Sequence, residues 1–489
     1  MINPATSADI SEGILATFAA CLLLAVHTLL TLGSNLWLLP LVPLLSLLLL
    51  TRVPLAFAGL CLVFILFQNL FASTGTGLVE DERELTAMLG SNYLLAVLGS
   101  GMALLSFLTG KKHADPTTSL QKIVLLALAL CLVYAAYGAT RSSPTSSLTY
   151  LRSTSFGLLL LLIGLYLGPR LRQKSFNALF GILGMLFCVY GLLEIAFPEL
   201  LYKAVNAAGY MALKYQDDQT VYNEHTLTDR TFRDAADVVR FNTRTWLNLT
   251  GSYALNLEML RPMGPNMHPI SYGYALGLSA LYFFTSRRRI LCVISLFLLL
   301  AVGAKGPLVM VCAALFITLC YSMGGNTAFV IVAGSFSLTY TGIVFSYGLS
   351  TQDFHVIGLV AGLKSLVTAP WGHGIGVGGN MSDLARQGRD FIEMQRSGAT
   401  YALDSAWGVL AYQMGVFGLV IPYILLRTVR ELLKTGNRAA TVWAAALIIV
   451  FCNAFFQEEA LAPAGWGLLL LLAGLQIAWH QNRPPVEAT

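Results

Sequence analysis

Long apolar runs recur along the whole chain, separated by short polar segments and by two long ones. Runs such as 123–139 and 466–479 are apolar on every face, whereas the strands of an outer-membrane barrel alternate apolar and polar residues over about 10 positions. A helix crosses a bilayer with about 20 mostly apolar residues. The pattern therefore predicts an all-α integral membrane protein, folded as a multi-span helical bundle.

We expect fourteen spans, at 13–32, 35–50, 55–73, 88–109, 121–139, 153–169, 175–196, 268–285, 290–303, 306–322, 326–347, 405–426, 439–457 and 463–480. One hairpin could be re-entrant, so twelve spans is the alternative. Five segments follow from this order: a seven-span bundle (1–196), a first long loop (197–267), a four-span segment (268–347), a second long loop (348–404) and a three-span bundle (405–489).

Composition and charge exclude several classes of protein. Hydrophobic residues make up 56% of the 489 positions and charged residues 11%, against about 25% charged in a soluble domain, which excludes a cytosolic enzyme. A net charge of +5 is too small to indicate a nucleic-acid partner.

The eight cysteines lie in apolar runs, so they predict neither a disulfide framework nor a CxxC metal site. Acidic Asp9 and Glu12 precede the first run, which indicates a first span and not a cleaved signal.

The basic residues of the short loops predict the orientation. Fifteen lie on one side of the predicted bundle and four on the other, namely Arg83, Arg141, Arg152 and Lys305. Because cytoplasmic loops carry the excess of Lys and Arg, both termini should be cytoplasmic and both long loops should face outward. The spans have almost no ionisable groups near their centres, which argues against an ion-coupled transporter or a flippase. Chemistry is therefore expected at the outer face.

The first long loop carries a group of arginines. Helical spacing over 226–246 would place four on one face: Arg230, Arg233, Arg240 and Arg244. Asp234 and Asp237 can pair with the first three, but no acid lies within four residues of Arg244, which makes it the candidate for an anionic ligand. The alternative is a solvated helix with internal ion pairs.

The second long loop predicts a surface helix over 352–367, a glycine-rich stretch from Trp371 through Gly374 to Gly379, and a second amphipathic helix. The glycines permit positive φ and close approach of a ligand, but the stretch lacks the lysine of a P-loop, so a nucleotide site is not expected. Two i,i+4 pairs, Arg386 with Asp390 and Arg389 with Glu393, account for two arginines as structural and leave Arg396 as a candidate for binding.

Three further places carry candidate chemistry: the turn-forming stretch from Arg261 to His268, Lys305 between two spans, and Asp404 where the second loop enters a span. Anchoring at the lipid headgroups is the alternative for each.

In layout and in short motifs, residues 261–418 resemble the superfamily of O-antigen ligases and Wzy-type O-antigen polymerases. Arg261-x-x-Gly264-Pro-Asn266-x-His268-Pro is similar to the family's Arg-x-x-Gly followed by an Asn/His-Pro turn. Ala304-Lys305-Gly-Pro-Leu resembles its Ser-Arg-Gly-Ala-Leu element. The stretch 369–378, then Asp404-Ser405-Ala-Trp and 415–418, resembles its glycine-rich outer loop and the following span.

The resemblance implies an inner-membrane glycosyltransferase of the metal-independent, GT-C-like type, without a cofactor. Its donor would be a glycan on undecaprenyl diphosphate at the periplasmic face, and its partners would be membrane lipids and a chain-length co-polymerase. The expected diphosphate clamps are Arg261, Lys305 and Arg240 or Arg244, because cations stabilise a diphosphate leaving group. Asp404, or second His268, would be the base for an acceptor hydroxyl. Further contacts are expected from the loop residues Gly264, Asn266, Trp371, Gly374 and Arg396.

Departures from the family pattern bear on its two branches. Ligases, which transfer glycan to lipid A-core, usually show His-Asn where this chain has Asp404-Ser405, which favours a polymerase. Polymerases are associated with Arg-x10-Gly in both outer loops; Arg240 to Gly251 fits, and no basic residue of the second loop does. Lys305 replaces an arginine, which keeps the charge and loses the bidentate fork. The ligase is the alternative, and a transporter or flippase of lipid-linked glycan is a third reading.

Overall fold

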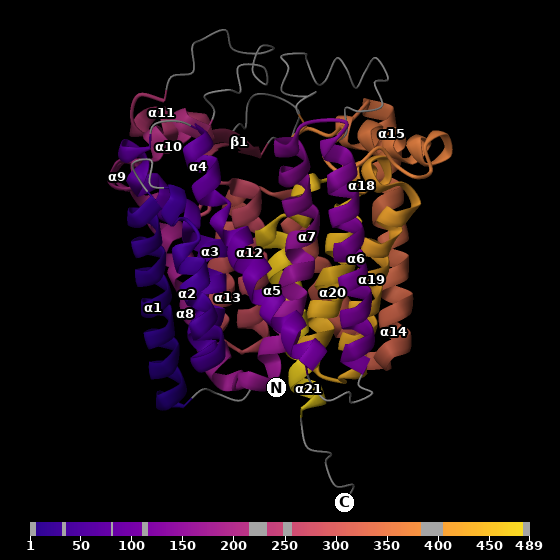
Figure 1. Ribbon diagram of the computed structural model, residues 1–489, viewed down its shortest axis with the longest axis horizontal. Coiled ribbons are helices and arrows are strands. Elements are labelled where there is room, and N and C mark those ends of the chain that lie inside the picture. The colour runs from indigo at the N-terminus through magenta and orange to yellow at the C-terminus, as the bar shows by residue number, and fades with distance from the viewer. Residues whose placement is uncertain are drawn as a thin grey trace, which may run out of the picture. The chain divides into compact units, whose positions relative to one another are not determined.

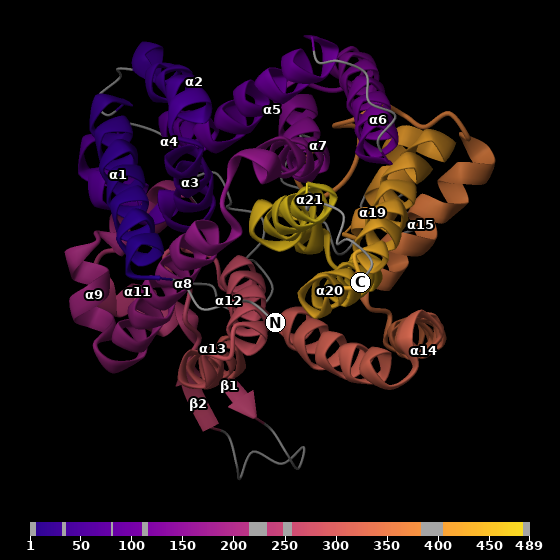
Figure 2. The same cartoon turned by 90° about the horizontal axis from the view of Figure 1, so that it is seen from below.

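The computed structural model describes residues 6–31, 36–79, 82–109, 116–214, 232–247, 257–382 and 404–482. Helices form most of this part of the chain, and its strands form a two-stranded antiparallel sheet. The chain divides into two compact units, each built from segments distant in sequence. Figure 1 and Figure 2 show long helices running side by side within each unit.

Unit 1 contains the first helices, a central group and the sheet. Its elements are α1 (Ser7–Thr31), η1 (Leu36–Leu38), α2 (Leu41–Arg52), α3 (Pro54–Gly75), η2 (Thr76–Leu78), α4 (Glu82–Leu89), most of α5 (Ser91–Thr109), α8 (Gln173–Ala196), α9 (Pro198–Ala204), α10 (Ala207–Lys214), α11 (Ala235–Asn242), β1 (Thr243–Leu247), β2 (Leu257–Leu260), α12 (Pro269–Thr285) and α13 (Arg289–Val302). Helix α1 packs on α3 and α8, and α12 packs on α13 and α8. A Cβ at Gly13 of α1 would lie 2.9 Å from the Leu179 nitrogen of α8, so a small residue allows this close packing.

Unit 2 contains the remaining long helices. Its elements are α6 (Pro116–Ala139), α7 (Pro144–Leu167), α14 (Lys305–Thr351) from Cys312 onward, α15 (Phe354–Thr368), α18 (Ala406–Met414), η5 (Gly415–Leu419), α19 (Val420–Lys434), α20 (Arg438–Asn453), η6 (Glu458–Leu461), η7 (Pro463–Gly467) and α21 (Leu468–Gln481). Helix α7 packs along α21, where a Cβ at Gly164 would lie 2.5 Å from the Leu471 oxygen. Non-helical φ/ψ angles at Gly324 and Gly325 break α14 between the predicted spans 306–322 and 326–347.

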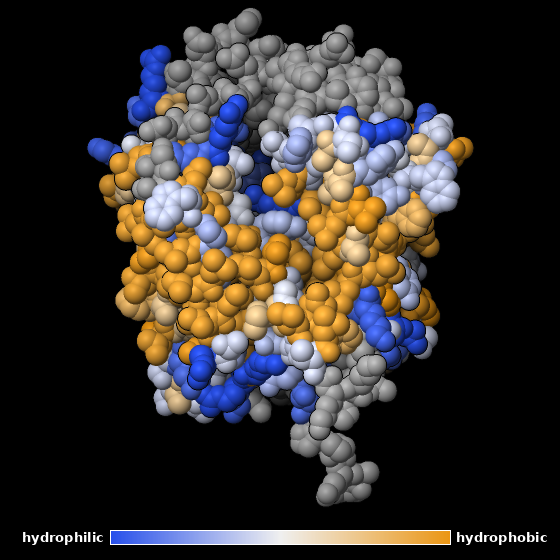
Figure 3. Space-filling view, in the orientation of Figure 1, coloured by the Kyte–Doolittle hydropathy of each residue, from blue (hydrophilic) through white to orange (hydrophobic). Residues whose placement is uncertain are grey.

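The described helices confirm the prediction of an all-α, multi-pass membrane protein. Within the described ranges, nine helical segments are long and apolar enough to cross a bilayer, and four apolar helices are shorter. Helical structure overlaps each of the fourteen expected spans; whether fourteen or twelve cross the membrane stays a prediction. Figure 3 shows a band of hydrophobic residues on the viewed face of each unit, with hydrophilic residues toward both ends of the helices. Exposed apolar side chains such as Leu15 and Phe18 of α1 and Leu132 of α6 suit contact with lipid.

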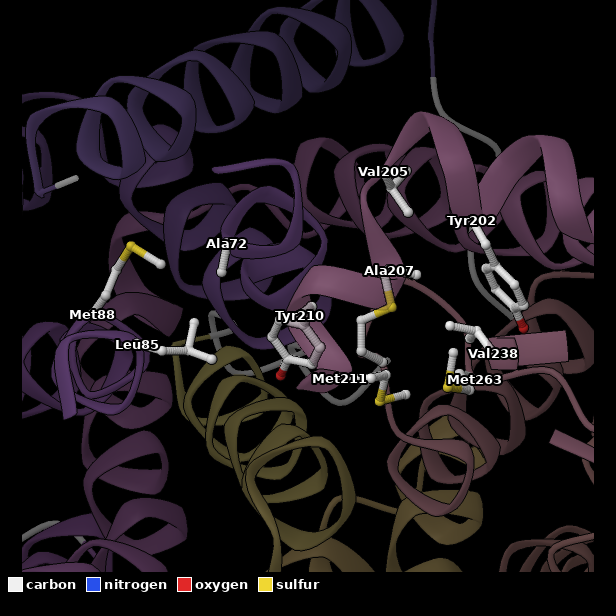
Figure 4. Packing of buried hydrophobic residues seen from close by; sticks show 11 residues of the cluster. Ala72, Leu85, Met88, Tyr202, Val205, Ala207, Tyr210, Met211, Val238 and Met263 are labelled. Carbon is white, nitrogen blue, oxygen red and sulfur yellow. The ribbon is translucent and has the colours of Figure 1, made fainter. Parts of the chain in front are cut away.

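A buried cluster at one end of unit 1 holds the turn from Arg261 to His268 against short helices (Figure 4). Its members come from α3, α4, α9 and the residue that follows it, α10, α11 and the turn itself: Ala72, Leu85, Met88, Tyr202, Val205, Ala207, Tyr210, Met211, Val238, Met263 and Met267. Met263 and Met267 are each 1% exposed, so the turn is part of a packed core.

The predicted helix over 226–246 is wrong at both ends of its described part: α11 begins at Ala235, so Arg233 precedes it, and the helix does not continue beyond Asn242. Helix α11 ends there, and Thr243–Leu247 forms β1, in which Thr243 pairs with Leu260 and Arg244 with Met259. Pairing with a strand later in the chain overrides the helical spacing of the arginines. Arg240 and Arg244 therefore do not share a helical face, and Arg230 lies outside the described residues. The predicted surface helix over 352–367 is confirmed as a helix, α15; the second amphipathic helix lies outside the described residues.

Candidate functional site

In unit 1, the buried carboxyl group of Glu194 organises the turn that begins at Arg261. Its oxygens accept hydrogen bonds from the Met263 amide at 2.7 Å, the Gly264 amide at 2.9 Å and the Tyr202 hydroxyl at 2.7 Å. Glu194 is 0% exposed and Gly264 has φ +65°, a conformation that glycine adopts without strain. Two amides of this turn are thus occupied by a carboxyl group of the protein itself.

Asn266 joins the same turn to α3. The side-chain amide of Asn266 donates to the Ile65 carbonyl at 3.0 Å, and the backbone carbonyl of Asn266 accepts from the side-chain amide of Asn69. The side chain is 6% exposed. These contacts give Asn266 a structural role, and its predicted contact with substrate stays a prediction.

His268 caps the N-terminus of α12, which begins at the next residue. Its Nδ1 accepts from the Ser271 amide at 3.3 Å and lies 3.0 Å from the Ser271 hydroxyl. The cations Lys214 and Arg261 lie near enough to His268 for their positive charge to act on it. The contacts with Ser271 give His268 a capping role, and its predicted role as a proton acceptor stays a prediction.

The candidate cations of unit 1 differ in their surroundings. The half-buried Arg261 donates through Nε to the Val302 carbonyl at 2.9 Å, and Lys305, three residues after Val302, is exposed at the start of α14. Both therefore lie where α13 passes into α14. The side chain of Arg240 is 78% exposed and lies 3.8 Å from Asp237, a separation at which an exposed pair contributes little stability. The side chain of Arg244 lies outside the described residues.

In unit 2, Asp404 is hydrogen-bonded to two other polar side chains. Its Oδ1 accepts from the Asn380 amide at 3.0 Å, and its Oδ2 lies 3.1 Å from His355 Nδ1. The same Nδ1 is 2.9 Å from the Asp404 carbonyl. Burial by itself would lower the pKa of His355, but the hydrogen bonds and the charge of Asp404 outweigh burial and raise that pKa to about 9. The two residues therefore form an ion pair at neutral pH.

A polar network continues from Asp404 into unit 2. The Tyr150 hydroxyl donates to Asn380 Oδ1 at 3.4 Å and accepts from the Met381 amide at 3.0 Å. The buried Glu458 hydrogen-bonds to Tyr150 and Asn380, and the negative charge of Asp404 acts on it. Glu459 follows in the same short helix. Asp404 thus lies among acidic and neutral polar groups, which suit the hydroxyls of an uncharged sugar better than a diphosphate.

The glycine-rich stretch has the predicted backbone conformation, and its close contacts are with the protein. Five of its glycines have positive φ: Gly372, Gly374, Gly376, Gly378 and Gly379. A Cβ at Gly374 would lie 2.6 Å from the Gly138 Cα of α6, and the Gly374 amide donates to the Gln413 carbonyl at 2.9 Å. The stretch positions Asn380 beside Asp404. Trp371 is 67% exposed and stacks on Phe417 with ring centroids 5.9 Å apart, and its predicted contact with substrate stays a prediction.

The structure thus brings Arg261, Gly264, Asn266 and His268 together in unit 1 and adds Lys305 near Arg261, whereas Asp404, Trp371 and Gly374 belong to unit 2. Arg396 lies outside the described residues. The sequence pattern predicts no role for Glu194, Lys214, His355 or Asn380. His355 stands 49 positions before Asp404 and Glu194 stands 70 before Gly264. No local pattern marks such pairs.

Among the described residues, no three His, Cys, Asp or Glu side chains are arranged so that they could hold a metal ion. Comparisons of the chain with models of protein families, with curated proteins and with solved structures give no match.

Proposed function

We propose that this protein is a metal-independent membrane glycosyltransferase of the GT-C-like type that polymerises a bacterial polysaccharide. It would transfer glycan from undecaprenyl diphosphate to a hydroxyl of another lipid-linked repeat unit. The reaction would take place at the periplasmic face of the inner membrane, with both termini in the cytoplasm. The observation that carries the proposal is the half-buried Asp404, 13% exposed, with His355 and Asn380 on its carboxylate.

The acceptor side of the reaction suits the Asp404 group. An attacking sugar hydroxyl needs a proton acceptor within hydrogen-bond reach and polar neighbours that orient it. Asp404, His355, Asn380 and Tyr150 supply both kinds of group. A sugar carries no charge, so the acidic surroundings of Asp404 do not oppose its binding.

The cations of unit 1, taken by themselves, have the chemistry that a diphosphate needs. A diphosphate leaving group gains negative charge as the glycosidic bond breaks, and cations nearby stabilise that charge. Arg261 is held in place by its hydrogen bond to the Val302 carbonyl, and the exposed Lys305 stands three residues after Val302. Lys214 contributes further positive charge near His268.

Purified protein in lipid nanodiscs, supplied with lipid-linked repeat units, tests the proposal. We expect longer glycans on the lipid from wild type, and about 10²-fold slower elongation from Arg261→Ala, because one positioned donor to a developing charge contributes about that factor. Arg430→Ala is the matched control, since Arg430 is exposed on α19 and belongs to neither candidate group. Transfer only to added lipid A-core would favour the ligase, and glycans left unchanged by wild type would refute both functions.

A further inference from the structure

Each oxygen of the Asp404 carboxylate already has a partner within the protein. Oδ1 accepts from Asn380 at 3.0 Å, and Oδ2 faces His355 Nδ1 at 3.1 Å. A carboxylate held in this way orients its partners well, but it has to give up part of that network before it can receive a proton from a substrate.

The position of His355 fixes which of its ring nitrogens carries hydrogen. Nδ1 lies between two acceptors, Oδ2 of Asp404 and the Asp404 carbonyl at 2.9 Å, so Nδ1 is the donor. Nε2 has no hydrogen-bond partner among the described residues. The side chain is 28% exposed, which leaves room for contact with a ligand. When the ring is neutral, Nε2 is its proton-accepting atom.

The charged groups that face His355 come from several elements. Asp353 caps the helix that carries it, Asp404 precedes α18, and Glu459 lies in η6. All three are acidic, and Lys364 lies farther along the same helix as His355. Negative charge on these sides stabilises an imidazolium, so His355 can accept a proton only after its ring has lost one, and the fraction of neutral rings grows as the pH rises toward about 9.

We propose that His355, through Nε2, receives the proton of the acceptor hydroxyl and that Asp404 is a positioning residue acting through it. This inference rests on the proposed function. The hydroxyl oxygen bonds to the anomeric carbon while the bond from that carbon to the phosphate oxygen breaks. The electron pair of that bond leaves with undecaprenyl diphosphate. The hydroxyl proton passes to Nε2, and His355 becomes an imidazolium paired with the Asp404 carboxylate.

Three variants separate the two roles. His355→Asn keeps a side-chain donor near the position of Nδ1 and removes Nε2, so the contact with Asp404 and the fold should survive. Asp404→Asn keeps the shape and removes the charge. His480→Gln is the control, because His480 is exposed at the end of α21. Thermal unfolding of each variant reports whether it is folded.

The measurement is kcat/KM for elongation between pH 6 and pH 10. In wild type we expect a rise of about tenfold per pH unit that levels off near the pKa of His355, about 9. His355→Asn should lose about 10²-fold or more at the plateau and lose the rise with pH. Asp404→Asn should move the rise below pH 6.5 and lower the plateau, because the pKa of His355 falls when the carboxylate is removed.

The outcomes keep the two proposals distinguishable. If wild type makes no longer glycan, the proposed function fails. If wild type is active and folded His355→Asn keeps its rate and pH profile, the assignment of His355 is overturned while the proposed function stands. An inactive Asp404→Asn beside an active His355→Asn would make Asp404 the proton acceptor.

Discussion

Replacing Glu194 by alanine tests whether this carboxyl group holds the turn that carries Arg261. The substitution leaves three buried donors without their acceptor, namely the Met263 and Gly264 amides and the Tyr202 hydroxyl. An unsatisfied buried donor costs about 1–3 kcal/mol. At the low end of that range, the turn loses about 3 kcal/mol of local stability.

Hydrogen–deuterium exchange measures this loss directly, because the exchanging amides belong to the turn itself. At about 1.4 kcal/mol per factor of ten, a loss of about 3 kcal/mol makes exchange of a peptide covering 261–268 about 100-fold faster. Glu194→Gln keeps one oxygen in place and should accelerate exchange by about tenfold. Peptides from α7 and α21, in unit 2, provide the internal reference.

Glu199→Ala is the matched control, since Glu199 is an exposed acid on α9 close to Glu194 in the chain. Its exchange in 261–268 should equal that of wild type. Exchange within about twofold of wild type in a folded Glu194→Ala protein would refute the reasoning, because the three hydrogen bonds would then contribute nothing to the turn.

Two further predictions concern unit 2. The pKa of His355 is raised from 6.5 to about 9 in the folded protein, so the ion pair with Asp404 contributes up to about 3 kcal/mol to stability. This contribution is fully present below pH 6.5 and is lost as the pH rises through about 9. The unfolding temperature of wild type should therefore fall over that range, and a similar fall in His355→Gln would contradict this. Gly374→Ala should destabilise the protein by about 2 kcal/mol or more, because φ is +104° and the new Cβ would lie 2.6 Å from the Gly138 Cα. Thermal unfolding checks this, with Gly334→Ala as the control, because a Cβ there meets nothing within 4 Å.

The features that sequence could predict depend on neighbours in the chain. The apolar runs predict helices because a bilayer or a packed bundle accepts only backbone that is hydrogen-bonded within itself. The break of α14 at Gly324 and Gly325 falls between two predicted spans. The positive φ angles of Gly374 and its neighbours follow from the lack of a Cβ.

The features that sequence could not predict depend on partners brought together by folding. The arginine spacing in 226–246 fits a helix, yet pairing of Thr243–Leu247 with Leu257–Leu260 makes β1 a strand. The glycines of the stretch 371–379 permit close approach of a ligand, and their described close contacts include the backbone of α6, α7 and α18. Polar side chains such as Glu194 and His355 take their roles from groups 49 to 70 positions away.

Two carboxyl groups hold the loops that carry the candidate residues, and this affects how substitutions should be interpreted. Glu194 holds the turn of Arg261 through backbone amides, and Asp404 holds the loop of Asn380 through side chains. Removing either acid displaces its neighbours, so a loss of activity alone cannot identify a proton acceptor. A group that receives the proton changes the pH profile, whereas a group that only holds a loop changes the exchange of its amides. Measuring both quantities on the same variants therefore distinguishes chemistry from positioning at each carboxyl group.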